Sequence, residues 1–495
     1  MTDLEKRRAQ DAMMLLAEKN TGEIEGRCVY KGDGTLEWLS PGDTSSPTAA
    51  LEAIMITCVI DAYEGRDMMS LDIPNAFIQT QMPMDAKSRV MMKITGLLVD
   101  MMIRLEPRYC DYVVIENGKQ VIYVRVLRAI YRMLEDKKLR GDMEKHGFIF
   151  NPYNGCIANK IVNGKQQTIR FHVDDLLSSH IDPKVNDDFC EWMNQKYGSI
   201  KPVKSKQGKI HEYLGMTLDF SKRGKGKVRM DDYVNRMLNE FPVKFKENEG
   251  CKTPASNNLL SIGKGEKLDD EKRETFHTFI AKGLFLSKRA RLDIAPTISV
   301  LSTRVQKPNQ TDWKRLVKLM YYLNGTKGMY LTLSAKDLQT FKWYIDASFA
   351  VHPDFRSHTG GVLTMGEGGS QIISKKQKLN SQSSTEAKLI GVDDAATQIL
   401  WTKLFVEAQG YPVEENILYQ DNKSSILLEK NGRDSARKRS QALNIRYFFM
   451  TDQVKKGNVT IEYCPTEKMW GDFMSKPLQG QKFLDFRSLI QGEQD

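Results

Sequence analysis

The sequence predicts a mixed α/β fold (α+β) that is divided among several domains. Its 495 residues are enough for roughly three domains of about 150 residues each. Two β-hairpins are marked by Asn-Gly turns between apolar runs, at residues 117–118 and 163–164. From about Phe341 onward, strand-like and helix-like segments alternate, which is typical of a sheet covered by helices.

The elements of the first half are predicted from local patterns. Residues 1–20 are rich in charge and predict a helix, whereas residues 21–48 contain many Gly, Ser and Pro and predict loops with short strands. The apolar run 49–63 predicts a helix. The following segment MMSLDIPNAFIQ predicts a strand that turns at Pro74.

After the second hairpin, residues 184–197 predict a helix, and HEYLGMTLDF predicts one strand that runs into the basic turn SKRGKGKVR. This turn is interpreted either as a phosphate contact or as a solvated lysine-rich turn. Residues 245–270 mix Gly, Pro, Asn and Ser and predict a linker. Residues 271–325 have apolar residues at helical spacing and predict helices.

The composition limits the classes of protein to which the chain can belong. Hydrophobic residues make up 40% of the chain, and the longest apolar stretch, residues 50–60, is too short to cross a bilayer. The charged start MTDLEKRRAQ predicts no secretory signal. Seven cysteines without a C-x-x-C pair predict free thiols in a reducing compartment.

The charge balance allows a nucleic-acid partner. The net charge is +10, from 73 basic and 63 acidic residues. Such an excess permits binding to a polyanion through counterion release. The alternative is a basic protein without such a partner.

A first group of carboxylates is carried on predicted strand ends. Asp72 ends the run MMSLD, and Asp174 and Asp175 follow the run TIRFHV. A two-residue turn prefers Gly or Asn, so two aspartates there are unusual. Three carboxylates without basic partners would repel one another and therefore predict bound Mg²⁺, which prefers oxygen ligands and phosphates. The alternative is that these aspartates are ordinary turn residues.

These segments resemble the reverse transcriptase of copia-type LTR retrotransposons. SLDIPNAFIQ and FHVDDLL are similar to its two aspartate motifs, and SSPTAALEAI, EYLGMTLDF and LFLSKRARLDI also match. The resemblance extends from about residue 20 to about residue 490. It implies a right-hand polymerase followed by a ribonuclease H-like α/β domain, divided as follows: an N-terminal charged helix (1–20), fingers and palm (21–240), a mainly helical thumb or connection (241–338) and the ribonuclease H-like domain (339–492).

The resemblance also implies the residues of the polymerase site. Two Mg²⁺ ions, or Mn²⁺ in their place, are expected on Asp72, Asp174 and Asp175. Five residues are expected to contact substrate: Phe77, Arg27, Tyr213, Leu214 and Gly215.

Each substrate contact has a separate expected role. Phe77 would exclude a ribose 2′-OH, although an isolated Phe is more often a core residue. Arg27 would contact the triphosphate of the incoming nucleotide. The segment that contains residues 213–215 would position the primer strand.

A second group of carboxylates lies in the segments WYIDASFA, SSTEAKLIG, LYQDNKSS and GDFMSKPL. These resemble the ribonuclease H domain of copia-type elements, in which two Mg²⁺ ions direct water at the RNA strand of an RNA–DNA hybrid. The resemblance implies four catalytic, metal-binding residues: Asp346, Glu386, Asp421 and Asp472.

Glu386 has an alternative role, because its spacing from Ser383 is that of a helix capping box. The family usually has a second Glu two residues further on. This chain has Lys388 there, which places a positive charge where a metal ion is expected.

Two further departures from the family pattern predict a partly degenerate copy, or a gene model with a misplaced intron. Residues 129–131 match a family segment, but Arg132 replaces Gly and several residues after Met133 are missing. Ala442 replaces a His that is thought to assist product release.

The sequence therefore predicts an RNA-directed DNA polymerase with an attached ribonuclease H domain. The expected partners are RNA template, DNA primer, RNA–DNA hybrid and dNTPs, together with a second copy of the chain or other products of the polyprotein, and no membrane. An intracellular location is expected, in a cytoplasmic particle or the nucleus. The alternative is a catalytically inactive nucleic-acid-binding remnant of the same fold.

Overall fold

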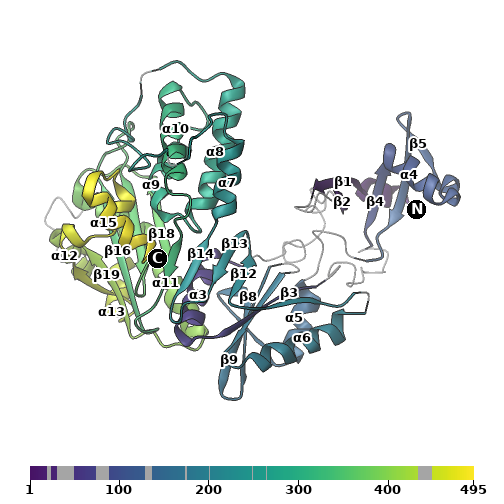
Figure 1. The fold of residues 1–495 in the computed structure, drawn as a ribbon, viewed down its shortest axis with the longest axis horizontal. Helices are drawn as coiled ribbons and strands as arrows, with labels where there is room; N and C mark the ends of the chain where they lie inside the picture. Colours follow the sequence, from purple (N-terminus) through teal and green to yellow (C-terminus); the bar gives the residue numbers. More distant parts are fainter. Residues whose placement is uncertain are drawn as a thin grey trace.

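The computed structural model describes residues 1–18, 24–30, 49–73, 89–128, 136–172, 175–199, 201–247, 249–263, 265–432 and 449–494. These residues form four β-sheets with helices packed around them (Figure 1). The predicted mixed α/β fold is confirmed.

The N-terminal sheet has its own small hydrophobic core and stands apart from the rest of the molecule in Figure 1. Two helices, a 3₁₀ helix and five strands form this unit: α1 (Asp3–Arg8), α4 (Leu97–Leu105), η3 (Pro107–Tyr112) and, in sheet order, β2 (Ile24–Tyr30), β1 (Gln10–Glu18), β4 (Met91–Thr95), β6 (Lys119–Arg125) and β5 (Val114–Glu116).

The prediction of one helix over residues 1–20 is wrong. The helix ends at Arg8, and residues 10–18 form a strand that pairs with β2 and β4. The segment DAMMLLAE consists largely of good helix formers, but the two neighbouring strands satisfy its backbone groups and outweigh that propensity. The predicted hairpin at residues 117–118 is confirmed, with φ of 49° and 75° at its two turn residues.

The central sheet carries the first group of carboxylates. The helices packed around it are α3 (Leu51–Glu64), α5 (Asp136–Lys145) and α6 (Pro183–Tyr197). The strands, in sheet order, are β11 (Lys204–Gly208), β3 (Asp67–Asp72), β10 (Asp175–His180), β9 (Lys165–His172), β8 (Asn154–Val162) and β7 (Ile149–Asn151). The predicted helices at 49–63 and 184–197 are confirmed, as is the hairpin at 163–164.

The segment HEYLGMTLDF forms a hairpin and not the single strand that was predicted. Leu214 and Gly215 both have positive φ, 51° and 76°, and so make a tight turn. The four-stranded sheet is built from β12 (Ile210–Tyr213), β13 (Met216–Asp219), β14 (Gly226–Arg229) and β15 (Leu331–Leu333).

Helix α7 (Asp231–Glu240), which was not predicted, follows β14 of this sheet. The helices predicted for residues 271–325 are confirmed as α8 (Asp270–Ser287), η4 (Leu292–Ile294), α9 (Ala295–Ser302) and α10 (Gln310–Asn324). Within the described residues, none of the helices combines the length and the apolar composition that crossing a membrane requires.

The C-terminal sheet has the predicted alternation of strands and helices. Three strands are antiparallel and two more are added in parallel, in the order β18 (Gln371–Lys376), β17 (His358–Thr364), β16 (Thr340–Ser348), β19 (Glu415–Gln420) and β20 (Thr460–Tyr463). The helices are α11 (Ser384–Ala408), α12 (Lys423–Asn431), α13 (Phe449–Lys455), α14 (Gly471–Ser475) and α15 (Gly480–Gln491), with a short 3₁₀ helix η8 (Thr466–Lys468).

A polar network holds the central sheet to α3. The carboxylate of Asp61 accepts a hydrogen bond from Ser179 at 2.7 Å and forms an ion pair with Arg170. It also lies 3.6 Å from the guanidinium group of Arg66. Both arginines and the aspartate are at most 1% exposed. A buried carboxylate is stabilised only while its counter-charges remain, so Asp61 ties α3, β9 and β10 together.

We predict that Asp61→Asn destabilises the protein by about 3–5 kcal/mol, because it removes the counter-charge of the buried Arg170 and one of the two carboxylates beside Arg66. Urea unfolding followed by circular dichroism measures the loss. Asp188→Asn, an exposed position on α6, is the matched control and should change stability by less than about 0.5 kcal/mol. Equal stabilities of the two variants would contradict the prediction.

Candidate functional sites

The fold brings the first group of carboxylates together at one end of the central sheet. Asp72 is the last residue of β3 and Asp175 is the first residue of β10. The two strands are antiparallel, and these two residues lie directly opposite each other. Residues opposite each other in an antiparallel pair project to the same face, so the two carboxylates are neighbours. Asp174 and Phe77 lie outside the described residues.

This pair of aspartates is open to solvent. The side chain of Asp72 is 43% exposed, and Asp175 is also exposed. Lys204 lies opposite Asp72 on the other neighbouring strand, with its Nζ 3.6 Å from Oδ2 of Asp72, but it is 78% exposed. Exposed ion pairs of this kind contribute little and are easily exchanged. Two exposed carboxylates side by side offer the oxygen ligands that Mg²⁺ prefers.

The residues predicted to contact substrate lie in two places. The backbone of Arg27 belongs to β2 of the N-terminal sheet. Tyr213 is only 3% exposed, and burial raises the pKa of its hydroxyl. Leu214 and Gly215 form the turn after it, with Gly215 exposed. Tyr213 therefore supports this turn from the core, and only the turn itself faces solvent.

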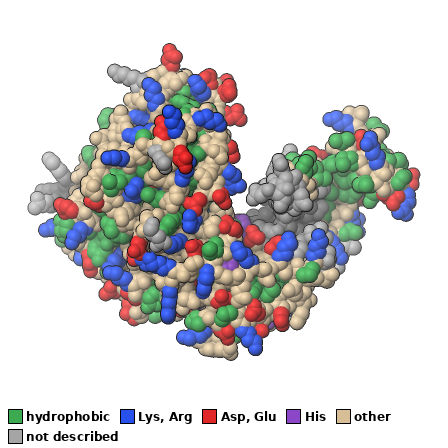
Figure 2. Space-filling model, in the orientation of Figure 1, with side chains coloured by type: hydrophobic (Ala, Val, Ile, Leu, Met, Phe, Trp, Pro, Cys, Tyr) green, Lys and Arg blue, Asp and Glu red, His purple; other side chains and the backbone are tan. Residues whose placement is uncertain are grey.

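Two lysines of the basic turn after β13 are paired with acidic residues of the same chain. Lys225 bonds to Glu367 at 2.7 and 2.8 Å and to Glu493, and Lys222 lies 3.4 Å from Glu493. On the face seen in Figure 2, basic and acidic side chains are interspersed over the main body. The charges of Lys222 and Lys225 are thus used in contacts within the protein, which favours the structural interpretation for these two residues over a phosphate contact.

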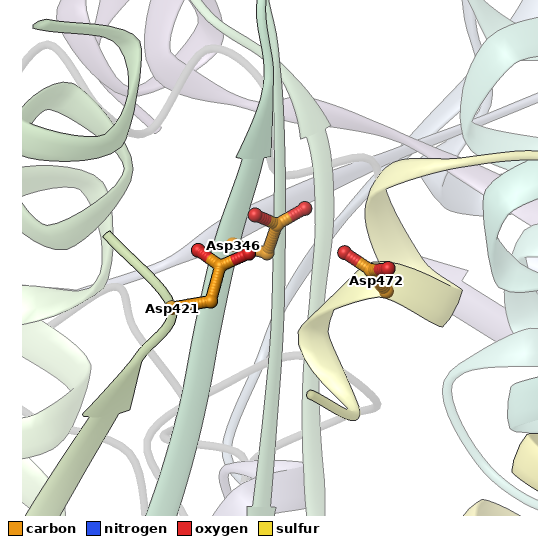
Figure 3. A group of neighbouring side chains, drawn as sticks. All are labelled: Asp346, Asp421 and Asp472. Carbon is orange, nitrogen blue, oxygen red and sulfur yellow. The ribbon is translucent and has the colours of Figure 1, made fainter. Parts of the chain in front are cut away.

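The second group of carboxylates converges in the C-terminal sheet. Asp346 lies on β16, Asp421 follows β19, and Asp472 lies on α14 (Figure 3). One ligand atom from each lies within 4.8 Å of the others. The close packing of α14 depends on Gly471, since a Cβ there would lie 2.8 Å from the backbone nitrogen of Asp346. Asp346 and Asp472 are each 1% exposed.

Lys388 enters this second group from α11. Its Nζ lies 2.6 Å from Oδ1 of Asp346 and also donates a hydrogen bond to Oδ1 of Asp421. Although burial opposes ionisation of Asp346, the ammonium groups of Lys388 and Lys476 hold the pKa of its carboxyl well below the ordinary value. The partners of Lys388 likewise raise its pKa against the effect of burial.

Two further lysines and a serine complete the contacts. Lys476 Nζ lies 2.5 Å from Oδ1 of Asp472 and 3.3 Å from Oδ2 of Asp346, and Lys482 Nζ lies 3.1 Å from Oδ2 of Asp472. Ser475 Oγ donates to Oδ2 of Asp346 at 2.5 Å. Three carboxylates that face three ammonium groups do not fit two Mg²⁺ ions.

Glu386 is used at the start of α11. Its Oε2 accepts a hydrogen bond from the backbone of Gln382 at 2.6 Å, and its own backbone N–H donates to Ser383 Oγ at 3.1 Å. Among the described residues, the three aspartates meet the ligand distances of a metal site together, and Glu386 is not among them. Ser383 therefore caps the helix, as the capping alternative predicted, but the carboxylate of Glu386 bonds to Gln382 and not to the N-cap backbone that a capping box requires. Residues 132, 133 and 442 lie outside the described residues.

Sequence reasoning missed the role of Lys476 and Lys482. Lys476 follows Asp472 by four residues within GDFMSKPL, and that spacing places opposite charges on one helix face. It was therefore a usable signal. Lys482 has no such signal, because only the packing of α15 brings it to Asp472.

Comparison with known proteins agrees with these observations. No protein-family model matches the chain. The retrovirus-related Pol polyprotein of transposon RE1 from Arabidopsis thaliana is 23% identical over 482 residues, which are 96% of this chain and 31% of that protein. That of transposon TNT 1-94 from Nicotiana tabacum is 26% identical over 269 residues, or 53% of this chain and 20% of that protein. The chain thus spans less than a third of the length of these relatives.

Among solved structures, a prototype foamy virus protease–reverse transcriptase aligns with 92% of this chain and 50% of its own, at 15% identity and a TM-score of 0.26. At this low score the fold assignment rests on the sheets described above. These sheets and the helices around them form the predicted mixed α/β fold. The relatives are Pol polyproteins of copia-type retrotransposons, and the predicted resemblance to that family is confirmed.

A pair of buried histidines supports the helix that carries Asp472. Ser374 Oγ donates to the backbone oxygen of Met474 at 2.8 Å, so it accepts from Nε2 of His358 at 3.0 Å. His358 Nδ1 lies 3.0 Å from Nε2 of His352 and accepts a hydrogen bond from its N–H. Burial lowers the pKa of His358 to about 3 and that of His352 to about 4. Protonation of His358 would break this chain of hydrogen bonds.

We predict that the C-terminal domain loses stability as the pH falls from 7 to 5. The unfolded chain binds a proton at His358 near its ordinary pKa of about 6.5, whereas the folded chain does so only near 3. The unfolded state therefore binds more protons in this window, and His358 alone accounts for about 2 kcal/mol at pH 5. Thermal unfolding at pH 7, 6 and 5 measures the effect. His358→Gln should reduce the pH dependence, and an unchanged dependence would refute this explanation.

Proposed function

We propose that this chain is the polymerase and ribonuclease H-like segment of a retrotransposon Pol polyprotein, and that it extends a DNA primer on an RNA template with dNTPs. The observation that carries this proposal is the pairing of Asp72 with Asp175 at the solvent-exposed end of the central sheet. The proposed division is fingers and palm to residue 240, a helical thumb or connection to residue 338, and the ribonuclease H-like domain beyond.

The proposed catalytic site consists of Asp72, Asp175 and the adjacent Asp174. These residues would hold two Mg²⁺ ions, which when bound stabilise the attacking and leaving oxygens of an in-line phosphoryl transfer. The contribution of the chain is positional. Because β3 and β10 are hydrogen-bonded neighbours, the separation of the two described carboxylates is fixed before substrate arrives.

Substrate contacts are proposed for residues around this site. Phe77 follows Asp72 by five residues and would pack against the sugar of the incoming nucleotide. The exposed turn Leu214-Gly215 would support the primer strand, and Arg27 would meet the triphosphate. The net charge of +10 supports a nucleic-acid partner.

A second candidate function is that of a nucleic-acid-binding remnant without turnover. Two observations favour it: the lysines inside the C-terminal acidic cluster, and the altered residues after Tyr131. Such a chain would bind a primer–template duplex without extending it.

Primer extension separates these two functions. With an RNA template, a DNA primer, dNTPs and Mg²⁺, we expect incorporation by the chain as it stands. Asp72→Asn and Asp175→Asn should each lower the rate by at least about a hundredfold, because each removes a charge that stabilises the transition state through the metal. Asp188→Asn is the matched control and should extend normally. Duplex binding without incorporation by the unaltered chain would establish the remnant instead.

Discrimination between sugars tests the role of Phe77. We predict that Phe77→Ala raises the relative incorporation of ribonucleotides by about tenfold or more, because it removes the group that excludes the 2′-OH. The measurement is the ratio of kcat/KM for a ribonucleotide and the matching deoxynucleotide. An unchanged ratio would assign Phe77 to the core.

A further inference from the structure

Lys388 takes the space that a metal ion would need between two of the C-terminal aspartates. Its Nζ is within hydrogen-bonding distance of both Asp346 and Asp421. A Mg²⁺ ion shared by these carboxylates would lie about 2.0–2.1 Å from their oxygens. An ammonium group and a dication cannot occupy that position together, since they repel each other at such a distance.

Lys388 is more deeply buried than the two other lysines of this cluster. Its side chain is only 12% exposed, and the adjacent residues Ala387 and Leu389 are buried on the same helix. The side chains of Lys476 and Lys482, which contact Asp472, are more exposed, at 39% and 45%. Lys388 is therefore the residue that decides whether a cation from solution can enter.

The carboxylates also have no need of a cation from solution. Asp346 is fully buried, and a buried carboxylate requires a counter-charge at all times for the fold to be stable. Lys388 supplies that charge from within the chain, in contact with two of the three aspartates.

We propose that Lys388 is a permanent internal counter-ion, so that the C-terminal domain is stable without divalent metal and leaves the RNA strand of a hybrid uncut. What this means for the order of reactions rests on the proposed polymerase function, in which the chain copies RNA into DNA. The product would be an intact RNA–DNA hybrid, and a separate ribonuclease that acts on hybrids must remove the RNA.

The first test measures metal binding directly. The background for this test is the full chain with Asn at the three positions of the central site, 72, 174 and 175, so that only the C-terminal cluster can bind metal. Mn²⁺ is titrated into this protein, and its binding is followed by electron paramagnetic resonance. We expect Lys388→Glu to bind Mn²⁺ at least about a hundredfold more tightly than the Lys388 form. Lys403→Glu, on the same helix and paired with Glu407, is the control for the charge change and should bind as the Lys388 form does.

Two outcomes of this titration would overturn the proposal. One is equal Mn²⁺ affinity of the Lys388 and Lys388→Glu forms. The other is tight Mn²⁺ binding by the Lys388 form that is lost in Asp421→Asn.

The second test measures stability. The unfolding temperature of the full chain should be the same in EDTA and in 10 mM Mg²⁺. Any difference that disappears in the Asp72→Asn variant is assigned to the central site and not to the C-terminal cluster. Lys388→Met, which keeps most of the side-chain volume and removes the charge, should unfold at a lower temperature in EDTA and recover in part with Mg²⁺. This variant serves even if Lys388→Glu fails to fold. An unchanged unfolding temperature for Lys388→Met would refute the counter-ion role.

The third test supplies a ready-made RNA–DNA hybrid with Mg²⁺ and no dNTPs, and follows the RNA strand by gel electrophoresis. We expect the RNA to remain intact. Cleavage by the unaltered chain that is abolished in Asp421→Asn would overturn the proposal. Because no primer is extended in this assay, failure of the proposed polymerase function would leave its result unaffected.

Discussion

The antiparallel pairing of β3 with β10 is the constraint on which the central site depends. Side chains alternate between the two faces of a sheet, so a slip of one residue would separate Asp72 from Asp175. Arg66, which directly precedes β3, donates a hydrogen bond to Ser179 of β10 at 3.5 Å and so opposes such a slip. Ser179 on β10 and Arg170 on β9 both bond to Asp61 of α3, which fixes the two strands against one helix. A structural charge network thus places the candidate catalytic pair.

Burial accounts for the different states of the two acidic groups. Asp72 is half exposed and its neighbour Lys204 extends into solvent, so water can stabilise the carboxylate until a cation arrives. Asp346 is buried, and without a permanent counter-charge it would destabilise the fold. Lys388 provides that charge and in doing so closes the position to metal. A cluster of acidic residues is therefore not by itself a metal site, because the surrounding charges decide its occupancy.

Much of this fold could be predicted from the sequence wherever local chemistry decides the structure. The Asn163-Gly164 turn and the helix that begins after Ser383 were predicted because their signals lie within a few residues. Residues 10–18 were predicted wrongly, since distant strands determine their conformation. In the C-terminal site, the family resemblance implied that the three aspartates form one group, and the fold does bring them together. The lysine contacts of that group could not be derived in full, because Lys482 reaches it only through tertiary packing.

Helix α11 connects the two halves of the molecule. It contains 25 residues and is therefore about 37 Å long. Lys388 lies in the first turns of this helix. Just past its C-terminal end, the hydroxyl of Tyr411 accepts a hydrogen bond from Arg66 at 2.7 Å. The backbone oxygen of Gln409 accepts another from Gln166 at 2.6 Å. The helix thus attaches the C-terminal sheet to the charge network of the central sheet. The C-terminal domain supports the central sheet through this helix. If Lys388 keeps that domain folded without metal, as proposed, the support persists even where RNA cleavage is lost.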